Sequence, residues 1–263
     1  MGILNVTPDS FSDGGRYLDP SRALARALEM QAQGADIIDV GGESTRPRAA
    51  VSVTEAEEIA RVRPVLERLG AKLRVPISID TRRSRVAQIA LDCGAAIVND
   101  ISALRDDPAL AAVAARARCA VVLMHMRGGA TDHIRHARYV DVVGEVADFL
   151  RGRARFAQAA GIARSRIIVD PGIGFAKLAS HNLRLLACLP RIAALGYPVL
   201  VGVSRKTFIR RLAGAGEREV AFASAAIDAM AVAAGASIVR AHDPAASRAA
   251  IAMARAIAAS DAR

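Results

Sequence analysis

Aromatic residues are scarce in this chain. Phe, Tyr and Trp together make up 3% of its 263 residues, and Trp is absent. Proteins that bind single-stranded nucleic acid stack the bases on aromatic side chains, so this composition argues against such a surface. The hydrophobic content is nevertheless 52%. We therefore expect a core of aliphatic side chains and alanine.

Cysteine is also sparse. The three cysteines, Cys93, Cys119 and Cys188, each stand alone in an apolar context, and the sequence has no C-x-x-C motif. Isolated cysteines in odd number are typical of buried thiols in a reducing compartment. No apolar run is long enough to span a bilayer, and the N-terminus lacks a basic segment followed by an apolar one. These absences predict a cytoplasmic protein with no membrane partner.

The positive charge of the chain is spread out rather than concentrated. The net charge is +10, and lysine supplies only three of the 36 basic residues, at positions 72, 177 and 206. Nucleic-acid-binding domains usually gather their basic residues into one patch or stripe. No such block occurs here, so the charge fits an anionic small substrate at least as well. We expect no nucleic-acid partner.

Short apolar segments alternate with helical patterns along the whole chain. Strands are predicted over residues 1–6, 37–40, 76–79, 94–98, 119–124, 167–169, 197–201 and 237–239. Helices are predicted over residues 20–33, 54–69, 84–92, 139–160, 182–195 and 219–234, with two more beginning near Pro108 and Pro244. Strands that are apolar throughout are typical of a parallel sheet covered by helices. Eight strand–helix units without a linker predict a single (β/α)8 TIM barrel over residues 1–263, in the α/β class.

An open doubly wound sheet is the alternative fold. It is expected to carry a G-x-G-x-x-G turn after its first strand, to bind a dinucleotide. The chain has no such turn, since the glycines of residues 172–174 lack the third member. A Gly-Ala-x-Ile-(Ile/Val) phrase recurs from Gly34, Gly94 and Gly235, each time joining a helix end to a strand start. This weak repeat favours a unit copied around a barrel.

Polar residues follow almost every predicted strand. Because the carboxyl ends of barrel strands face one mouth, where active sites are built, we expect these residues to form a ring. The ring consists of Asn5, Asp39, Asp80, Asn99, Met124-His125, Asp170, the stretch Ser204-Arg205-Lys206, and the stretch Arg240-Ala241-His242.

The acceptors in this ring match one kind of ligand edge. Asp80, Asn99 and Asp170 offer carboxylate and amide oxygens that can pair with adjacent N–H donors, as on a 2-amino-4-oxo pyrimidine ring. Lys206 can meet the carbonyl group of such a ring. The pattern predicts a site for a flat, guanine-like heterocycle.

The remaining ring members and two loops extend this site. Arg240, His242 and Asn5 offer donors suited to phosphate, which indicates an anionic leaving group on the heterocycle. The Gly-rich polar segments 9–15 and 41–48 are long enough to cover a bound substrate.

Four stretches resemble the signature segments of the dihydropteroate synthase family, in the same order and across essentially the whole chain. They are MGILNVTPDSFSDGG at 1–15, DVGGESTRP at 39–47, DPGIGF at 170–175 and SRK at 204–206. The joint match is specific, although any one stretch alone is not. The resemblance implies a folate-biosynthesis transferase that condenses 6-hydroxymethyl-7,8-dihydropterin diphosphate with 4-aminobenzoate, giving 7,8-dihydropteroate and diphosphate. It also implies a carbocation-like (SN1-type) course, a Mg2+ ion on the diphosphate, inhibition by sulfonamides and a homodimer.

The resemblance assigns residues position by position. The implied pterin-binding residues are Asp80, Asn99, Met124, Asp170, Phe175, Gly202 and Lys206. The implied diphosphate-binding residues are Asn5, Arg240 and His242, with Asn5 also near the metal. The implied 4-aminobenzoate-binding residues are Phe11, Thr45, Arg46, Pro47 and Ser204. The residues expected to act in catalysis are Asp13, Arg46, Lys206 and Asp80, of which Asp13 and Arg46 come from the two loops.

The chain departs from the family pattern in two ways. Family members usually carry residues before the first strand, whereas this chain begins inside it, so we expect a segment covering the lower end of the barrel to be missing. Thr207 stands where the family commonly has Ser, which preserves the hydroxyl group. Ordering Gly-rich loops is entropically unfavourable. We therefore expect 4-aminobenzoate or a sulfonamide to bind only after diphosphate or the pterin substrate.

Three other functions fit part of the sequence. A pterin-dependent methyltransferase shares the carboxylate–amide grip, but it has less use for Arg240, His242 or the Ser-Thr-Arg-Pro loop. A non-catalytic pterin-binding paralogue is disfavoured by the presence of Asp13, Arg46 and Lys206. A basic nucleic-acid-binding protein is disfavoured by the scattered arginines and the low aromatic content.

Overall fold

Strands and helices alternate as the sequence predicts. The computed structural model describes residues 1–7, 19–43, 53–129, 133–214 and 216–260. The strands are β1 Gly2–Asn5, β2 Ile38–Gly41, β3 Ile77–Asp80, β4 Ile97–Asp100, β5 Ala120–Met124, β6 Ile167–Asp170, β7 Leu200–Val201 and β8 Ile238–Val239. The helices are α1 Pro20–Ala32, α2 Glu55–Gly70, α3 Ser84–Asp92, α4 Ala109–Ala117, α5 Val142–Ala159, α6 Ala179–Ala187, α7 Leu189–Ala193, α8 Thr207–Ala213, α9 Glu217–Ala233 and α10 Pro244–Ser260.

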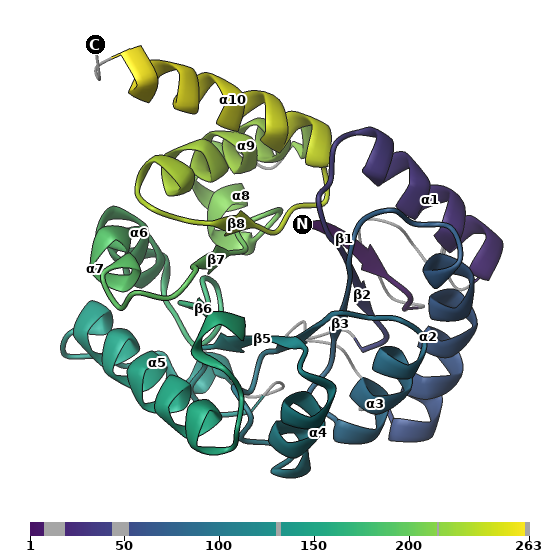
Figure 1. Cartoon of the computed structure of the whole chain (residues 1–263). Helices are drawn as coiled ribbons and strands as arrows, with labels where there is room; N and C mark the ends of the chain where they lie inside the picture. Colours follow the sequence, from purple (N-terminus) through teal and green to yellow (C-terminus); the bar gives the residue numbers. More distant parts are fainter. Residues whose placement is uncertain (8–18, 44–52, 130–132, 215, 261–263) are drawn as a thin grey trace.

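The strands form a closed ring with the helices outside it (Figure 1). Strands β1 to β6 pair in chain order, β7 pairs with β8, and every pairing is parallel. Two parallel bridges complete the ring: Val169 with Val199 joins β6 to the start of β7, and Gly2 with Ala241 joins β1 to the end of β8. The predicted (β/α)8 barrel is therefore confirmed.

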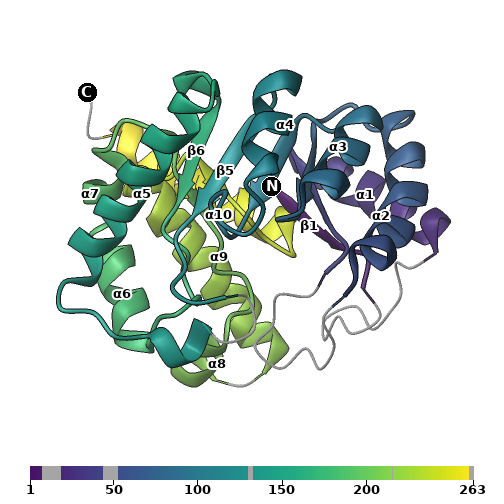
Figure 2. The ribbon, with the colours of Figure 1, turned by 90° about the horizontal axis from the view of Figure 1, so that it is seen from below.

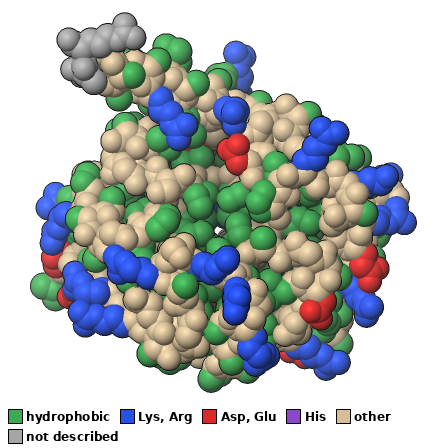
Figure 3. All heavy atoms as spheres, viewed as in Figure 1, with side chains coloured by type: hydrophobic (Ala, Val, Ile, Leu, Met, Phe, Trp, Pro, Cys, Tyr) green, Lys and Arg blue, Asp and Glu red, His purple; other side chains and the backbone are tan. Residues whose placement is uncertain are grey.

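The core changes character along the barrel. Four inner side chains from β4 to β7, namely Ile97, Val122, Ile168 and Leu200, pack together as one buried apolar cluster. Apolar side chains surround the barrel axis on the face shown in Figure 3. This apolar cluster fills the barrel interior below the carboxyl ends of the strands. The polar side chains at those strand ends therefore lie at the carboxyl mouth of the barrel.

Local signals in the sequence explain where the first helices begin. At α2 the predicted capping box is present: the Glu57 N–H donates to Thr54 Oγ1 at 3.2 Å, and the Thr54 N–H donates to Glu57 Oε2 at 2.8 Å. At α1 the Asp19 carboxylate accepts from the Ser21 N–H at 2.7 Å. These caps fix the connections that lead away from the mouth.

One helix prediction was wrong in detail, and one helix was missed. The helix predicted over 182–195 is two helices, α6 and α7, with Cys188 between them. Pro190 in the first turn of α7 has no N–H to continue the ladder of α6, and proline is tolerated only at such a start. Helix α8, which begins directly after Lys206, was not predicted; Phe208 and Ile209 supply its buried face.

Strand register places the mouth residues side by side. Asn5 pairs with Gly41, Gly41 with Asp80, and Asp80 with Asn99, so the ends of β1 to β4 lie at one level. The helices run alongside these strands, as the turned view in Figure 2 shows. No helix among the described residues is long and apolar enough to cross a membrane.

Candidate active site

Arg240 joins two carboxylates across the mouth. Its Nε donates to Asp39 Oδ2 at 2.6 Å, and its Nη2 donates to Asp80 Oδ2 at 2.8 Å. The Asp39 side chain is fully buried, whereas Asp80 and Arg240 keep 14% and 21% of their side-chain surface exposed. The ion pair therefore has a buried side at Asp39 and a side at Asp80 that a ligand can reach.

Burial and charge act against each other in this triad. Burial raises the pKa of Asp80 to about 7, and the Arg240 guanidinium opposes that rise. Burial also disfavours the charged form of Arg240, but Asp39 and Asp80 outweigh it and raise the Arg240 pKa. The Arg240 charge thus favours the anionic form of Asp80 against the effect of burial.

Asp39 organises its neighbours. Its Oδ2 accepts from Asn99 Nδ2 at 3.1 Å as well as from Arg240, so one buried oxygen orients two predicted ligand-binding residues. The sequence placed Asp39 in the ring but gave it no role toward a ligand. A charged residue between Ile38 and Val40 in a fully buried strand was the signal that could have identified it.

A second charged group lies on the other side of the mouth. The Asp170 carboxylate accepts from the Gly172 N–H at 2.6 Å. Burial raises the Asp170 pKa, and the positive charge of Lys206 is the largest effect opposing that rise. Burial lowers the pKa of Lys206 to about 8, against the pull of Asp170. Lys206 Nζ donates to the Ile173 carbonyl and lies 4.7 Å from the centre of the Phe175 ring.

Apolar side chains pack beside the second charged group. Met124 packs with Ile101, Met126 and the partly buried Phe175. Gly202 leaves room beside Arg240, since a methyl group on Gly202 would approach the Arg240 Cβ no closer than 3.7 Å. Charged groups with an apolar wall beside them suit a flat heterocycle with polar edges.

Ser204 and His242 form a third group. The Ser204 Oγ lies 2.9 Å from His242 Nδ1 and accepts from the His242 backbone N–H at 3.2 Å. The family resemblance implies a role for Ser204 in binding 4-aminobenzoate and for His242 in binding diphosphate. Their contact brings these two predicted site residues together at the ends of β7 and β8.

Comparison with known proteins identifies the family. The profile described as "Pterin binding enzyme" matches residues 1–242. A dihydropteroate synthase from Synechocystis is 45% identical over 244 residues, which is 92% of this chain and 84% of the relative. This chain belongs to the dihydropteroate synthase family.

Solved structures agree with this assignment. A dihydropteroate synthase from Xanthomonas albilineans, determined with 4-aminobenzoic acid, matches with a TM-score of 0.90 and 45% identity, over 98% of this chain and 92% of that one. One from Yersinia pestis, determined with a sulfonamide drug complex, matches with a TM-score of 0.93 and 38% identity, over 99% and 93%. The matches extend over nearly the whole barrel.

Two side-chain oxygens converge at the ends of β1 and β3, where the family resemblance implies a magnesium ion. A methyl group placed on Gly41 would lie 3.7 Å from Asn5 Oδ1 and 3.8 Å from Asp80 Oδ2, so these two oxygens converge on one point. Among the described residues no group of three or more His, Cys, Asp and Glu side chains could hold a metal. Mg2+ commonly binds few protein oxygens together with substrate phosphates and water, so the Asn5 environment fits it.

Five residues assigned by the family resemblance lie outside the described residues. They are Phe11, Asp13, Thr45, Arg46 and Pro47. Their roles stay predictions.

A buried histidine–lysine pair supports the wall of the site and was not foreseen as a pair. Lys177 Nζ lies 2.9 Å from His125 Nδ1 and donates to the Phe175 carbonyl at 2.9 Å. Burial lowers the pKa of Lys177 well below its usual value, and burial together with the Lys177 charge lowers that of His125. The pair ties the end of β5, next to Met124, to the chain at Phe175.

Gly172→Ala is expected to destabilise the fold strongly. Gly172 has φ +67, and an added Cβ would lie 1.9 Å from the His125 carbonyl oxygen, so backbone would have to move. We expect the free energy of unfolding to fall by about 3 kcal/mol or more, because strain and overpacking add. Gly94→Ala is the matched control: Gly94 has φ +97 with nothing within 4 Å, so only the strain of about 1–2 kcal/mol remains. Urea unfolding of both variants measures the difference, and equal losses would contradict the account.

Proposed function

We propose that this chain condenses 6-hydroxymethyl-7,8-dihydropterin diphosphate with 4-aminobenzoate, giving 7,8-dihydropteroate and diphosphate. The observation that carries the proposal is the pair of charged groups at one barrel mouth: Asp80 held by Arg240 on one side, and Asp170 beside Lys206 on the other. The family membership supports the same reaction. It is supported further by the 4-aminobenzoic acid and the sulfonamide described for the two solved relatives.

In this proposal the pterin lies against the apolar wall at Met124 and Phe175. Asp170 accepts from the amino-pyrimidine N–H groups, and Lys206 donates to the ring carbonyl. Asp80 and Asn99 face the remaining ring N–H and nitrogen atoms. Asp170 suits this role because one of its oxygens is already oriented by the Gly172 N–H and the other is left for the ligand.

The first step breaks the bond between the pterin methylene carbon and the bridging diphosphate oxygen. The electron pair leaves with the diphosphate, and the positive charge spreads into the electron-rich ring. The Asp80 and Asp170 carboxylates, both largely buried before the reaction, stabilise that charge. Arg240 has N–H groups beyond the two that hold Asp39 and Asp80, and these, with His242, bind the departing anion.

Asn5 would hold the magnesium ion together with the diphosphate oxygens. When bound, the metal supplies positive charge that stabilises the leaving diphosphate.

The second step forms the new carbon–nitrogen bond. The amine of 4-aminobenzoate attacks the methylene carbon and loses one proton, and no covalent enzyme intermediate is needed. Ser204 is placed for this subsite by its contact with His242, which adjoins the leaving group. Phe11, Thr45, Arg46 and Pro47 complete the subsite in the proposal, with Asp13 and Arg46 acting near the reacting atoms.

Release of diphosphate tests this function. Purified protein is incubated with the pterin diphosphate ester and magnesium, with and without 4-aminobenzoate, and steady-state diphosphate formation is measured. We expect turnover only with 4-aminobenzoate, and suppression by a sulfonamide that is competitive with it. Methyl transfer to or from a pterin in place of this reaction would instead support the methyltransferase alternative.

We propose in addition a cytoplasmic homodimer. The free cysteines Cys93, Cys119 and Cys188 support a reducing compartment. Large apolar side chains that are 60% exposed or more project from the last three helices: Leu212 on α8, Phe222 and Met230 on α9, and Met253 and Ile257 on α10. Large apolar side chains exposed on neighbouring helices are typical of a subunit interface. Sedimentation equilibrium is expected to give twice the mass of one chain, and a single-chain mass would contradict the dimer.

A further inference from the structure

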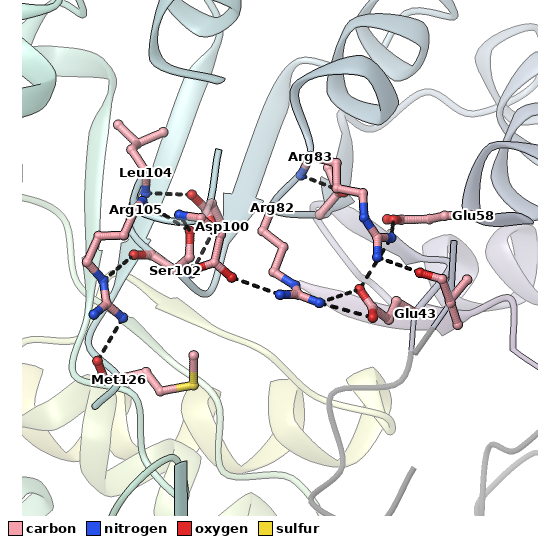
Figure 4. Close-up of polar contacts among 12 residues, drawn as sticks. Glu43, Glu58, Arg82, Arg83, Asp100, Ser102, Leu104, Arg105 and Met126 are labelled. Atoms are coloured by element: carbon pink, nitrogen blue, oxygen red, sulfur yellow. Dashed lines mark hydrogen bonds and ion pairs between the residues drawn. The ribbon is translucent and has the colours of Figure 1, made fainter. Parts of the chain in front are cut away.

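Asp100, the last residue of β4, folds the loop that follows this strand. Its Oδ1 accepts from the Ser102 N–H at 2.7 Å, and its Oδ2 accepts from the Leu104 N–H at 2.6 Å (Figure 4). Asp100 is fully buried. Burial raises the pKa of its carboxyl group, and the hydrogen bonds from Ser102 and Leu104 oppose that rise. Both carboxylate oxygens are thus used to hold the backbone of residues 101–105.

Asp100 faces away from the barrel interior, unlike its neighbour Asn99. Successive side chains of a strand point to opposite faces of the sheet. Asn99 pairs in register with Val122, which belongs to the inner apolar cluster. Asp100 pairs with Leu123, which packs in the core cluster that also contains helix residues. Asp100 therefore lies next to the pterin site without pointing into it.

The loop after Asp100 contains two consecutive residues with left-handed backbone. Ala103 has φ +53 and Leu104 has φ +63. This conformation is unfavourable for a residue that carries a Cβ, so other contacts must stabilise it. Arg153 on α5 supplies two of them: its Nε donates to the Ala103 carbonyl at 2.7 Å, and its Nη2 donates to the Leu104 carbonyl at 3.1 Å. The shape of the loop therefore depends on side-chain contacts, with Asp100 binding the N–H groups and Arg153 the carbonyl groups.

Arg105 joins this loop to the chain after β5. Its Nε donates to the Ser102 carbonyl at 2.8 Å, and its Nη2 donates to the Met126 carbonyl at 2.9 Å. Figure 4 shows the guanidinium reaching both carbonyl groups. The two joined segments carry Ile101 and Met126, and both of these side chains pack with Met124. Arg105 thus fixes the position of the loop relative to the apolar side chains around Met124.

We infer that Asp100 and Arg105 are positioning residues for the pterin substrate. This inference rests on the proposed function, which places the pterin against the apolar wall at Met124 and Phe175. Asp100 sets the conformation of the loop, and Arg105 sets its position relative to the chain after β5. Both residues act on the pterin through Ile101 and the wall that it packs against, and neither contacts the substrate.

Asp100→Asn is expected to weaken the calorimetric affinity for 6-hydroxymethylpterin about tenfold. The amide nitrogen would face a loop N–H that needs an acceptor, so the loop would leave its left-handed conformation. The KM for the pterin diphosphate ester should rise to a similar extent. The kcat and the KM for 4-aminobenzoate should stay within about twofold, because only binding of the pterin is weakened.

Asp107→Asn is the matched control. Asp107 also accepts from two backbone N–H groups, those of Ser84 at 2.7 Å and Ala109 at 3.0 Å, but these lie at the starts of α3 and α4. The variant should therefore have a lower melting temperature and an unchanged pterin affinity. A loss of pterin affinity in Asp107→Asn equal to that in Asp100→Asn would show that general destabilisation is the cause, and would overturn the inference.

Arg105→Gln keeps the test valid if Asp100→Asn folds poorly. Arg105 is exposed, so the melting temperature should stay near that of the wild type. Gln is too short to reach both carbonyl groups, and we expect the pterin affinity to fall about threefold. The double variant Asp100→Asn with Arg105→Gln should lose no more affinity than Asp100→Asn alone, because both residues act through the same loop.

Wild-type pterin affinity in either folded single variant overturns the inference. So does a double variant whose loss is the product of the two single losses, about thirtyfold, since that result would mean that the residues act independently. Equal rises in the KM values of both substrates would also overturn it. These outcomes leave the proposed function intact as long as the wild type forms dihydropteroate. A wild-type protein that binds the pterin and forms no dihydropteroate overturns the proposed function instead.

Discussion

Asp170→Asn is expected to reduce the affinity for 6-hydroxymethylpterin about 100-fold. The Asp170 Oδ1 accepts from the Gly172 N–H at 2.6 Å. In the variant the amide oxygen would take the same position, because only an oxygen can accept this hydrogen bond. The amide nitrogen would then face the N–H donors of the pterin, donor against donor. Losing a charged acceptor and leaving buried donors unpaired costs about 1.5–3 kcal/mol, which corresponds to the expected change.

Titration calorimetry with 6-hydroxymethylpterin measures this loss without the reaction. Asp148→Asn is a suitable control, because the Asp148 side chain is 74% exposed on α5 and the same chemical change should have no effect there. An Asp170→Asn variant that binds the pterin as tightly as the wild type would show that this carboxylate does not face the ligand.

Arg240→Ala is expected to weaken binding of the diphosphate ester about 100-fold, and binding of bare 6-hydroxymethylpterin by no more than about tenfold. The larger loss follows from the N–H groups that Arg240 offers to the diphosphate. The smaller loss follows from Asp80, since removing the guanidinium leaves the buried carboxylate without the charge that opposes the rise in its pKa. The variant should therefore bind bare pterin more weakly as the pH falls towards neutrality, because a protonated Asp80 presents an O–H donor in place of one acceptor oxygen.

Paired titrations of the two ligands into Arg240→Ala give the required comparison. Arg248→Ala serves as a control, since Arg248 on α10 is 60% exposed and its carboxylate partner, Asp36, lies 3.5 Å away at the surface. Equal losses of affinity for the two ligands would show that Arg240 only positions Asp39 and Asp80 and does not bind the diphosphate.

The ring of strand ends could be predicted because it depends on local patterns. Each apolar run ends at a polar residue, and parallel strands of similar length bring those ends to one level, as the pairing of Asn5, Gly41, Asp80 and Asn99 confirms. The division of the helix at Cys188 could also have been predicted, since Pro190 has no N–H to donate to a preceding turn. It was missed because the apolar spacing continues across the break.

The pairing of charges could not be predicted in the same way. Arg240 is separated from Asp80 by 160 positions, and nothing local tells which carboxylate a guanidinium will meet. The same holds for Arg83 at the start of α3, which pairs with Glu58 on α2 and donates to the Val53 carbonyl before that helix. Such contacts depend on the direction and the burial of side chains, which follow from the tertiary structure of the barrel and not from the local sequence.

The most direct test of the account follows the amine of the second substrate into the product. Purified protein is mixed with the pterin diphosphate ester, magnesium and 4-aminobenzoate labelled with a heavy nitrogen in its amine, and the products are analysed by mass spectrometry. We predict labelled 7,8-dihydropteroate in equal amount to the diphosphate released, and neither product from Asp170→Asn at the same protein concentration. Diphosphate released without labelled dihydropteroate, or no release by a folded wild-type protein that binds the pterin, would contradict the account.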